Sequence, residues 1–487
     1  MTSTNNINLV DDKWIPVIKQ NSRFEYASLS EIFSDATNIV DLSVDTLERI
    51  SLMRLLICIA EASLAFSDKK DAFVNAKNYL SELATTYLQK WKHKFNLFDA
   101  KYPFLQVADA TEGSSKPIAS LNFYEATGNS KIFINNKPCA ESLSLQQIAL
   151  KLLVYQNFAP QGLSGRFKWA NNYTSNTPQG SCKDSICTAQ NALHAFVLKS
   201  NIIETIIANL VEPIELNKGI RIQKQNLGEP HWHFELTSQS TPTEAVNNNT
   251  KTFLGRLVPL CRAVKLLDCE NVYLGAGLIY ESFPVSREFT CTIIHSEKGD
   301  SILRSNVNKD IWRSLQSLLA NYQIDNKHAT APYALYLNSQ QAFTLWVGGI
   351  ATNNNDILKT IESSFHMPLL SQDDARLDNA IKAYTQSVSI AEKIEFRLSK
   401  AVNKYKEILS TKTGVGGKAK PQYWSILEKR QVVLMKLFNT KYDIERTIKE
   451  WEEICKTSAE KAFAFACPHQ TPRMIIAYAK AREALFK

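Results

Sequence analysis

Residues 377–409 read LDNAIKAYTQSVSIAEKIEFRLSKAVNKYKEIL, and this stretch settles the architecture of the last quarter of the chain. Apolar side chains recur in it at alternating spacings of three and four residues, interrupted once by the polar Glu395. The series consists of Leu377, Ile381, Tyr384, Val388, Ala391, Leu398, Val402, Tyr405 and Leu409. Such spacing places one apolar stripe along a helix, as in the seam of an antiparallel helical bundle.

Three more helical stretches follow this helix, after the glycine-containing loop Thr411–Pro421. They cover about residues 422–438, 444–465 and 472–486. Pro472 suits the first turn of the last helix, and Thr471 suits its N-cap. We therefore predict a four-helix bundle over residues 373–487.

Residues 1–372 show a mixed pattern that predicts both helices and strands. Leu47–Phe66 has helical apolar spacing behind a plausible N-cap, Asp45. Further helices are expected over about residues 71–92, 143–158 and 189–210. Residues 8–18 and the apolar run that Gly348-Gly349 ends predict strands, and Thr241–Lys251 predicts a surface loop. The fold class is thus α+β, with a large mixed N-terminal domain (1–372) before the bundle.

The net charge is distributed unevenly along the 487 residues, which hold 56 Lys and Arg against 48 Asp and Glu, a formal charge of +8. Residues 373–487 contain 22 basic and 14 acidic residues, whereas residues 1–372 contain 34 of each. The whole positive excess therefore lies in the predicted bundle. This asymmetry suggests a polyanion beside the bundle, with a merely solvated helical face as the equally weighted alternative.

Cysteine use and hydropathy predict a cytoplasmic protein that does not enter a membrane. The nine cysteines are dilute, odd in number and never spaced as Cys-x-x-Cys, which favours reduced thiols. The start MTSTNNINLVDDKW lacks the pattern of a secretory signal. The longest apolar stretch, Leu52–Phe66, contains Arg54 and Glu61 and is too short to span a bilayer.

Motifs for catalysis, metals and cofactors are missing. The chain has no phosphate-binding P-loop, dinucleotide fingerprint, zincin helix or nucleophile elbow. His231-Trp232-His233 could place two imidazoles on one face of a strand, and Cys182 and Cys187 lie five residues apart, but neither pair has further ligands nearby. We expect a structural aromatic strand, no metal, no cofactor and no catalytic residue. A nuclease or other enzyme with a non-contiguous active site, and a scaffold that binds only protein, stay open as alternatives.

Three segments combine residue types suited to nucleic-acid contact. Ala159–Lys168 (APQGLSGRFK) has glycines that let the backbone approach a groove, with Arg166 and Lys168 to neutralise phosphates. Residues 346–356 (WVGGIATNNND) place a polar, Asn-rich turn after an apolar run, and residues 133–137 (FINNK) form an aromatic and amide tip. Each has a plain structural alternative: an ordinary loop, turn-forming asparagines and a hairpin end, respectively.

In chain order, these segments and three others resemble the CasA family, the large subunit of the type I-E CRISPR surveillance complex (Cascade). The similar segments are 8–17 (NLVDDKWIPV), Tyr102–Gln106 (YPFLQ), Ile132–Asn136, Ala159–Lys168, Gly348–Leu358, and the end of the chain from Ala464 to Phe486. Each motif alone is weak, but six in the same order over nearly the whole chain are specific.

The resemblance implies a non-catalytic role. Such subunits recognise the protospacer-adjacent motif (PAM) in double-stranded DNA, mainly from the minor groove, and help to open the duplex for pairing with the guide RNA. Their bundle contacts target DNA, and they recruit the helicase-nuclease that degrades it. The implied partners are the other Cascade subunits with CRISPR RNA, target DNA and that helicase-nuclease.

The resemblance also implies site residues, carried over by position. The family's glycine loop maps onto Gly162, Ser164, Gly165 and Arg166, followed by Lys168, and its first DNA-proximal loop maps onto Phe133 and Asn135. The wedge that splits the duplex maps onto Thr352, Asn353 and Asn354, and the lysine finger maps onto Arg287. The residues of the bundle that would contact DNA are Lys393, Lys400 and Lys404. Ser164 and Arg166 occupy glycine positions of the family, which implies a different PAM preference. Asn354 is one methylene shorter than the family's glutamine. A cysteine-rich insertion of some members is missing, in line with the expectation of no metal.

Overall fold

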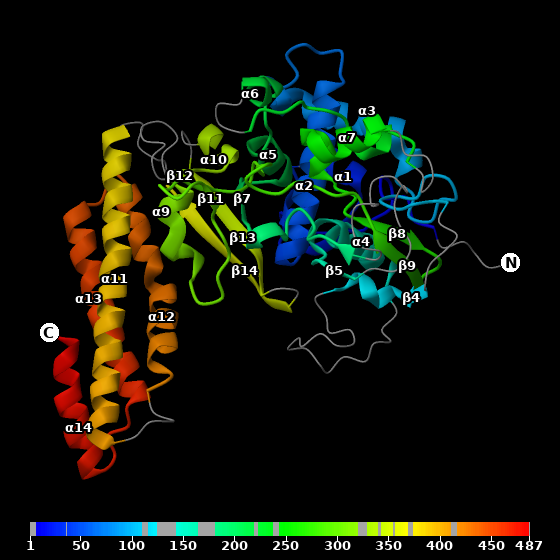
Figure 1. The fold of residues 1–487 in the computed structure, drawn as a ribbon. Helices are drawn as coiled ribbons and strands as arrows, with labels where there is room; N and C mark the ends of the chain where they lie inside the picture. Colours follow the sequence, from blue (N-terminus) through cyan, green and yellow to red (C-terminus); the bar gives the residue numbers. More distant parts are fainter. Residues whose placement is uncertain are drawn as a thin grey trace. The chain divides into compact units, whose positions relative to one another are not determined.

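The structure, a computed structural model, describes residues 6–35, 37–109, 115–123, 143–163, 181–218, 223–236, 243–319, 329–338, 342–353, 356–368, 374–410 and 416–486 (Figure 1). The chain divides into two compact units. The N-terminal unit consists of residues 1–307, 330–337 and 344–364, and the C-terminal unit of residues 308–329, 338–343 and 365–487.

The N-terminal unit is built around a helical core. Its helices are α1 (Leu29–Ser34), α2 (Thr46–Ala65), α3 (Ala76–Trp91), α4 (Leu145–Phe158), α5 (Ile202–Ala208), α6 (Pro213–Lys218), α7 (Thr243–Lys251) and α8 (Phe253–Leu257), with α10 (Tyr333–Asn338) at its edge. Helix α2 is buried on almost every side and packs against α3, α4 and α8. The Asp45 carboxylate accepts hydrogen bonds from the backbone N–H groups of Leu47 and Glu48, so the predicted N-cap is confirmed.

Short strands form small sheets around these helices. Their orders are β2 (Phe24–Ala27)-β1 (Ile15–Lys19)-β3 (Ile39–Leu42), β4 (Ser115–Pro117)-β9 (Asn271–Ala276)-β8 (Arg262–Leu266), β14 (Asp356–Met367)-β13 (Phe343–Asn353)-β7 (Leu193–Leu198), β11 (Ser301–Ile302)-β10 (Ile293–Ile294)-β12 (Ala329–Thr330), and the pair β5 (Gly162–Leu163)-β6 (Ser181–Cys182). The mixture of helix and sheet confirms the predicted α+β class.

The C-terminal unit contains the predicted four-helix bundle. Its helices are α11 (Asp374–Leu409), α12 (Ala419–Arg430) with its 3-10 continuation η6 (Gln431–Phe438), α13 (Ile444–Ala466) and α14 (Pro472–Arg482) (Figure 1). Helix α11 packs against each of the others through its apolar stripe, in which Tyr384 and Tyr405 are fully buried. The Thr471 hydroxyl accepts a hydrogen bond from the Met474 N–H, which confirms the expected cap of the last helix.

A segment from before the bundle belongs to the same unit. Residues η5 (Ile311–Ser314) and α9 (Leu315–Leu318) pack against α11, and the Trp312 ring meets the Trp451 ring edge-on, with centroids 5.7 Å apart. The Tyr384 hydroxyl donates a hydrogen bond to the Trp312 carbonyl over 2.8 Å. This buried tryptophan extends the bundle's core beyond the four helices.

Four local expectations are wrong. Residues 189–210 form a 3-10 turn, the strand β7 and the helix α5 instead of one helix, because β7 pairs with the distant β13. Residues 243–251 form α7 instead of a loop, and the buried Asn249 amide donates a hydrogen bond to the Ala245 carbonyl. His231–His233 form the 3-10 turn η4, not a strand. Gly348-Gly349 lie in the middle of β13, which continues to Asn353.

Among the described residues, no helix combines the length and the apolar character needed to cross a membrane.

Candidate nucleic-acid interface

The glycine segment starts and ends at the two-stranded ladder β5-β6. Gly162 pairs with Cys182 and Leu163 with Ser181, so the chain departs after Leu163 and returns at Ser181. The intervening candidate residues Ser164, Gly165, Arg166 and Lys168 lie outside the described residues. Gly162 itself has open space where a Cβ atom would stand, so crowding does not demand glycine at this position.

One buried arginine holds both sides of this ladder. The Arg262 guanidinium, on β8, donates hydrogen bonds to the carbonyls of Ala159 and Pro160 before the segment and to the carbonyl of Lys183 after it, over 2.8 to 2.9 Å. Arg262 is only 3% exposed. Its backbone is fixed by Gln156 of α4, whose amide group accepts from the Arg262 N–H and donates to its carbonyl. These charge-assisted bonds fix the distance between the two ends of the segment.

Hydrogen bonds with the Asn191 side chain fix Thr352, the first of the wedge candidates. Asn191 has a positive φ of 57°, a backbone conformation that asparagine tolerates better than most residues. Its side-chain oxygen accepts hydrogen bonds from the N–H and the hydroxyl of Thr352, over 3.1 and 2.6 Å, and its amide nitrogen donates to the Thr352 carbonyl. Thr352 is therefore fixed next to Asn353, the last residue of β13. Asn354 lies outside the described residues.

Close packing explains the glycine pair on the same strand. A Cβ atom at Gly349 would lie 2.6 Å from the Ala192 carbonyl oxygen, and one at Gly348 would collide with the Trp346 ring. At Gly349 the backbone just before β7 thus lies too close to β13 for a side chain to fit between them.

Arg287, the finger candidate, is partly exposed and already paired. Its guanidinium donates to the Asp300 carboxylate over 3.1 Å, and its backbone N–H donates to the Gln223 side chain over 2.6 Å. The side chain is 38% exposed, so a phosphate can compete with Asp300 for it. The structure places Arg287 at the surface, as a DNA-contacting finger requires.

The neighbouring residue anchors this segment in the core. The Glu288 carboxylate accepts hydrogen bonds from Arg54 of α2 and Arg256 of α8, each over 2.7 Å. Burial alone would raise the pKa of Glu288, but the two guanidinium groups outweigh it and lower the pKa to about 2. Glu288 is therefore charged at neutral pH, and its two ion pairs fix the backbone that carries Arg287.

Residues next to the glycine segment, next to Asn191 and next to Arg287 line one hollow of about 280 Å³. Its lining includes Gln161 and Lys183 at the glycine segment, Gln190 beside Asn191, and Ser286 and Glu288 on either side of Arg287. The chain neighbours of Gly162 and Arg287 thus meet at one concave surface, whereas Thr352 and Asn353 do not line it.

The bundle candidates lie on one helix, α11. Lys393 and Lys400 are exposed and Lys404 is partly exposed, and helical geometry places the three on one face. The Lys400 ammonium lies 4.5 Å from the centre of the exposed Phe396 ring. The stripe has the positive charge and the aromatic surface on which single-stranded nucleic acid can stack.

The remaining candidates do not form a site in the described part. Phe133 and Asn135 lie outside the described residues. His231, His233, Cys182 and Cys187 do not assemble a metal centre, and no group of three or more His, Cys, Asp or Glu side chains suited to a metal ion occurs among the residues that the structure describes.

Sequence reasoning missed Arg262 and Asn191, which position the candidates without being part of a motif. The only sequence signal for Arg262 is a basic residue at the start of an apolar strand, RAVKL. Asn191 gives no local signal, because its partner Thr352 is distant in the sequence.

Comparison with known proteins gives one consistent family. The family model of CRISPR-associated protein Cse1 matches residues 8–462. The curated CRISPR-associated protein CasA/Cse1 of Thermus thermophilus is 30% identical over 222 residues, which cover 43% of this chain and 41% of the relative. The match therefore spans less than half of that relative's length.

Solved structures share the fold over the whole chain. Thermus thermophilus CasA (Cse1) has a TM-score of 0.74 at 20% identity, covering 99% of each chain. Cse1 from Acidimicrobium ferrooxidans has a TM-score of 0.74 at 18% identity, covering 99% of this chain and 97% of that one. A chain of a CRISPR RNA-guided surveillance complex has a TM-score of 0.71 at 15% identity, covering 99% of this chain and 100% of its own length.

Proposed function

Because the chain belongs to the Cse1 family of CRISPR-associated proteins, we propose that it is the large, non-catalytic subunit of a type I-E RNA-guided surveillance complex. In this role it recognises the PAM in double-stranded DNA, promotes opening of the duplex and recruits a helicase-nuclease. Its partners are the other subunits of the complex with their CRISPR RNA, the target DNA and that nuclease, and it works in the cytoplasm.

The observation that supports the proposal is a set of three buried supports, whose neighbouring residues line the 280 Å³ hollow. Arg262 fixes the base of the glycine segment, Asn191 fixes the strand that leads to the wedge, and Glu288 fixes the segment of Arg287. Preorganised supports of this kind are what a binding site needs, because side chains that are ordered in advance lose less entropy on binding.

The chemistry of the candidates fits reading DNA from the minor groove. Backbone and amide groups can distinguish A·T from G·C pairs there, but little more, so a short and relaxed PAM is expected. Pushing a polar turn into the duplex costs a few kcal/mol of unstacking. Pairing with the guide then offsets the lost DNA pairs approximately one for one. Neither step needs a nucleophile or a metal.

The experiment that tests the proposal measures binding of the assembled complex to a library of targets with randomised PAM positions. Gly165→Asp and Asn354→Ala should each weaken PAM-dependent binding about tenfold or more, since base-edge and backbone contacts are typically worth about 1–3 kcal/mol. Gly417→Ala, at an open position of the C-terminal unit, and Asn78→Ala, on the exposed face of α3, are the matched controls. Unchanged target affinity in both test variants would refute the site.

Two alternatives give different results. Cleavage of DNA by the purified chain with a divalent metal, without any helicase-nuclease, would favour the nuclease. Duplex binding by the complex that ignores the PAM would favour a scaffold that contacts only protein.

A further inference from the structure

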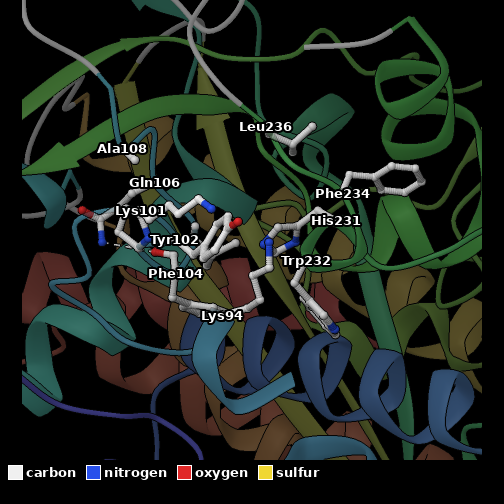
Figure 2. A pocket seen from close by; sticks show the side chains of 12 residues that line it. Lys94, Lys101, Tyr102, Phe104, Gln106, Ala108, His231, Trp232, Phe234 and Leu236 are labelled. Atoms are coloured by element: carbon white, nitrogen blue, oxygen red, sulfur yellow. Dashed lines mark hydrogen bonds between the residues drawn. The ribbon is translucent and has the colours of Figure 1, made fainter. Parts of the chain in front are cut away.

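The 280 Å³ hollow beside the candidate interface is large enough to hold a ring system. A second hollow, lined by Tyr102, Gln106 and His231, measures about 40 Å³ and has room for a few water molecules at most (Figure 2). An apolar cavity of about 150 Å³ can hold benzene, so the larger hollow has room for a bicyclic heterocycle. The residues described in its lining all belong to the N-terminal unit.

Apolar side chains form much of the described lining of this larger hollow. They come from the segment before β7, the segment after β9, and β11: Ile186, Ala189, Ala192, Tyr280, Phe283 and Ile302. Gln190 ties the first two segments together, because its amide nitrogen donates to the Phe283 carbonyl over 2.6 Å. Its side-chain oxygen accepts from Arg304. The lining segments are therefore fixed relative to each other before a ligand binds, and their apolar side chains suit the flat faces of an aromatic ring.

The Glu288 carboxylate supplies hydrogen-bond acceptors to this hollow. One of its oxygens accepts from Arg54 and the other from Arg256, each over 2.7 Å. A carboxylate oxygen has two lone pairs, so each oxygen can accept one further hydrogen bond. The Glu288 side chain lines the hollow and is 11% exposed, so its two arginine partners do not seal it off. A ligand with two neighbouring N–H donors would complete the hydrogen bonding of this carboxylate.

The charges on the described lining balance one another. The lining contributes two cations and three carboxylates, namely Lys183, Arg256, Asp184, Glu281 and Glu288. Arg54 adds a third cation through its ion pair with Glu288. An ionic ligand would therefore find no excess of opposite charge to compensate the loss of its hydration. A neutral ligand that both donates and accepts hydrogen bonds fits this lining better than either kind of ion.

We propose that this hollow binds a guanine base by its Watson–Crick edge. The N1–H and 2-amino groups donate to the two Glu288 oxygens, and the O6 and N7 atoms accept from Lys183 and from the Ser282 and Ser286 hydroxyls. Among the four DNA bases, only guanine places two donors side by side on this edge. The base comes from a free guanine nucleoside or nucleotide, or from an unstacked guanine of DNA. The second source rests on the proposed function, and the first does not.

The decisive comparison is guanosine against inosine on the purified full-length chain. Inosine lacks the 2-amino group of guanosine and is otherwise identical to it. Titrations followed by saturation-transfer NMR should show saturable binding of guanosine to one site. Inosine should bind at least about tenfold more weakly, because it leaves one oxygen of a charged, largely buried carboxylate without its donor. Equal binding of the two nucleosides, or no binding of guanosine, would overturn the proposal.

Variants assign the binding to this hollow. Ala189→Leu, in the 3-10 turn η3 (Ala189–Asn191), fills part of the hollow, so guanosine affinity should fall at least about tenfold. Ala119→Leu is the matched control, because Ala119 is also a partly exposed alanine of a 3-10 turn, η2 (Ile118–Leu121), and does not line the hollow. If Ala189→Leu does not fold, as judged by circular dichroism, Ser282→Leu at the exposed rim takes its place with the same expectation. Full guanosine affinity in the folded variant contradicts the assignment.

Oligonucleotides identify the source of the base. A short thymidine strand with one central deoxyguanosine is compared with the same strand containing deoxyinosine, by fluorescence anisotropy. Tighter binding of the deoxyguanosine strand, lost in Ala189→Leu, supports an unstacked guanine of DNA as the occupant. A preference seen with the nucleosides alone supports a free nucleoside or nucleotide, and a strand preference that persists in Ala189→Leu contradicts the hollow as the site. These measurements use the isolated chain, so their failure leaves PAM-dependent binding by the assembled complex as a separate question.

Discussion

The candidate sites of the two units differ in how their polar side chains are fixed: by buried hydrogen bonds in the N-terminal unit, and by none at the exposed candidate lysines of the C-terminal unit. In the N-terminal unit, Arg262, Asn191 and Glu288 make several hydrogen bonds each to distant parts of the chain, and Arg262 is almost completely buried. In the C-terminal unit, Lys393 and Lys400 are exposed on α11 and take no part in the apolar packing and the buried hydrogen bonds that hold this helix.

This difference predicts two kinds of response to mutation. Removing one buried partner leaves the other group without a hydrogen bond, which costs about 1–3 kcal/mol for each orphaned group. Removing one exposed lysine costs the fold almost nothing and weakens contact with a polyanion in a salt-dependent manner. Mutation of the buried supports in the N-terminal unit should therefore change stability and geometry, whereas mutation of the exposed bundle lysines should change charge alone.

The largest difference between the two units should be in how much stability each loses at acidic pH. Burial lowers the pKa values of His194 and His231 to about 4 and about 3. Below about pH 6.5 the unfolded chain binds a proton at each ring and the folded unit does not, so stability falls as the pH falls toward 4. We expect the two histidines to contribute a loss on the order of 5 kcal/mol in the N-terminal unit, which is partly offset because burial raises the pKa of Glu61 in α2. The histidines described in the C-terminal unit, His366 and His469, are exposed.

Hydrogen exchange with mass spectrometry can compare peptides from α2 and α13 at about pH 7 and about pH 4, after correction for intrinsic exchange rates. Protection should fall in α2 and persist in α13. His194→Gln should flatten the pH dependence of α2. An equal loss of protection in both helices would remove the proposed contrast.

Arg262→Met should have the next largest effect. It leaves the carbonyls of Ala159, Pro160 and Lys183 without their charged donor, and we expect the unfolding free energy to fall by at least about 3 kcal/mol. Chemical denaturation measures the loss. Lys265→Met, three residues along the same strand at a partly exposed position, is the control and should lose less than about 1 kcal/mol. Similar losses in both variants would show that Arg262 is no special clamp.

Asn191 allows hydrogen bonding and backbone strain to be separated. Asn191→Ala loses the bonds to Thr352 and places alanine at a positive φ, so we expect a loss of about 2–3 kcal/mol. Asn191→Gly also loses the bonds but tolerates the backbone conformation, and it should lose about 1 kcal/mol less. Denaturation gives stability, and the fluorescence of a base analogue in the target reports duplex opening by the complex. Both variants should slow opening. A normal rate of duplex opening in both variants would show that the wedge does not depend on Asn191.

Mutating the three candidate lysines of α11 should leave the stability of the fold unchanged. Reversing Lys393, Lys400 and Lys404 to Glu should lower the salt dependence of target binding by a slope of about 2, at roughly 0.7 for each phosphate of a single strand. The control reverses three other exposed bundle lysines, Lys429, Lys449 and Lys461. Target affinity is measured at several salt concentrations. A slope equal to that of the unmodified complex would mean that the stripe does not touch DNA.

The sequence predicted those elements that depend on local spacing. The apolar stripe of α11 and the cap at Asp45 are local signals, and both are confirmed. Residues 193–198 were predicted to be helical because a short buried apolar run has no distinctive period, and only pairing with β13 makes it a strand. Likewise, α7 forms despite its asparagines because the Asn248 side chain bonds to the backbone of Glu229.

The candidate site was predictable only in part. The resemblance supplied Gly162, Arg287 and Asn353, and the structure places the chain neighbours of Gly162 and Arg287 in the lining of the hollow. The supports Arg262 and Asn191 could not be predicted, since their partners are separated from them by long stretches of sequence. Buried hydrogen bonds of this kind depend on the completed fold.

The Arg262 clamp has a consequence for how this family can vary. Since one side chain ties the backbone before residue 164 to the backbone after residue 180, the ends stay in place whatever sequence lies between them. The entropy of closing a flexible loop grows only slowly with length, by about 0.6 kcal/mol for each doubling. Under the proposed function, exchanging the segment between the ends for that of a relative should change the preference for the DNA target while leaving the core beneath it intact.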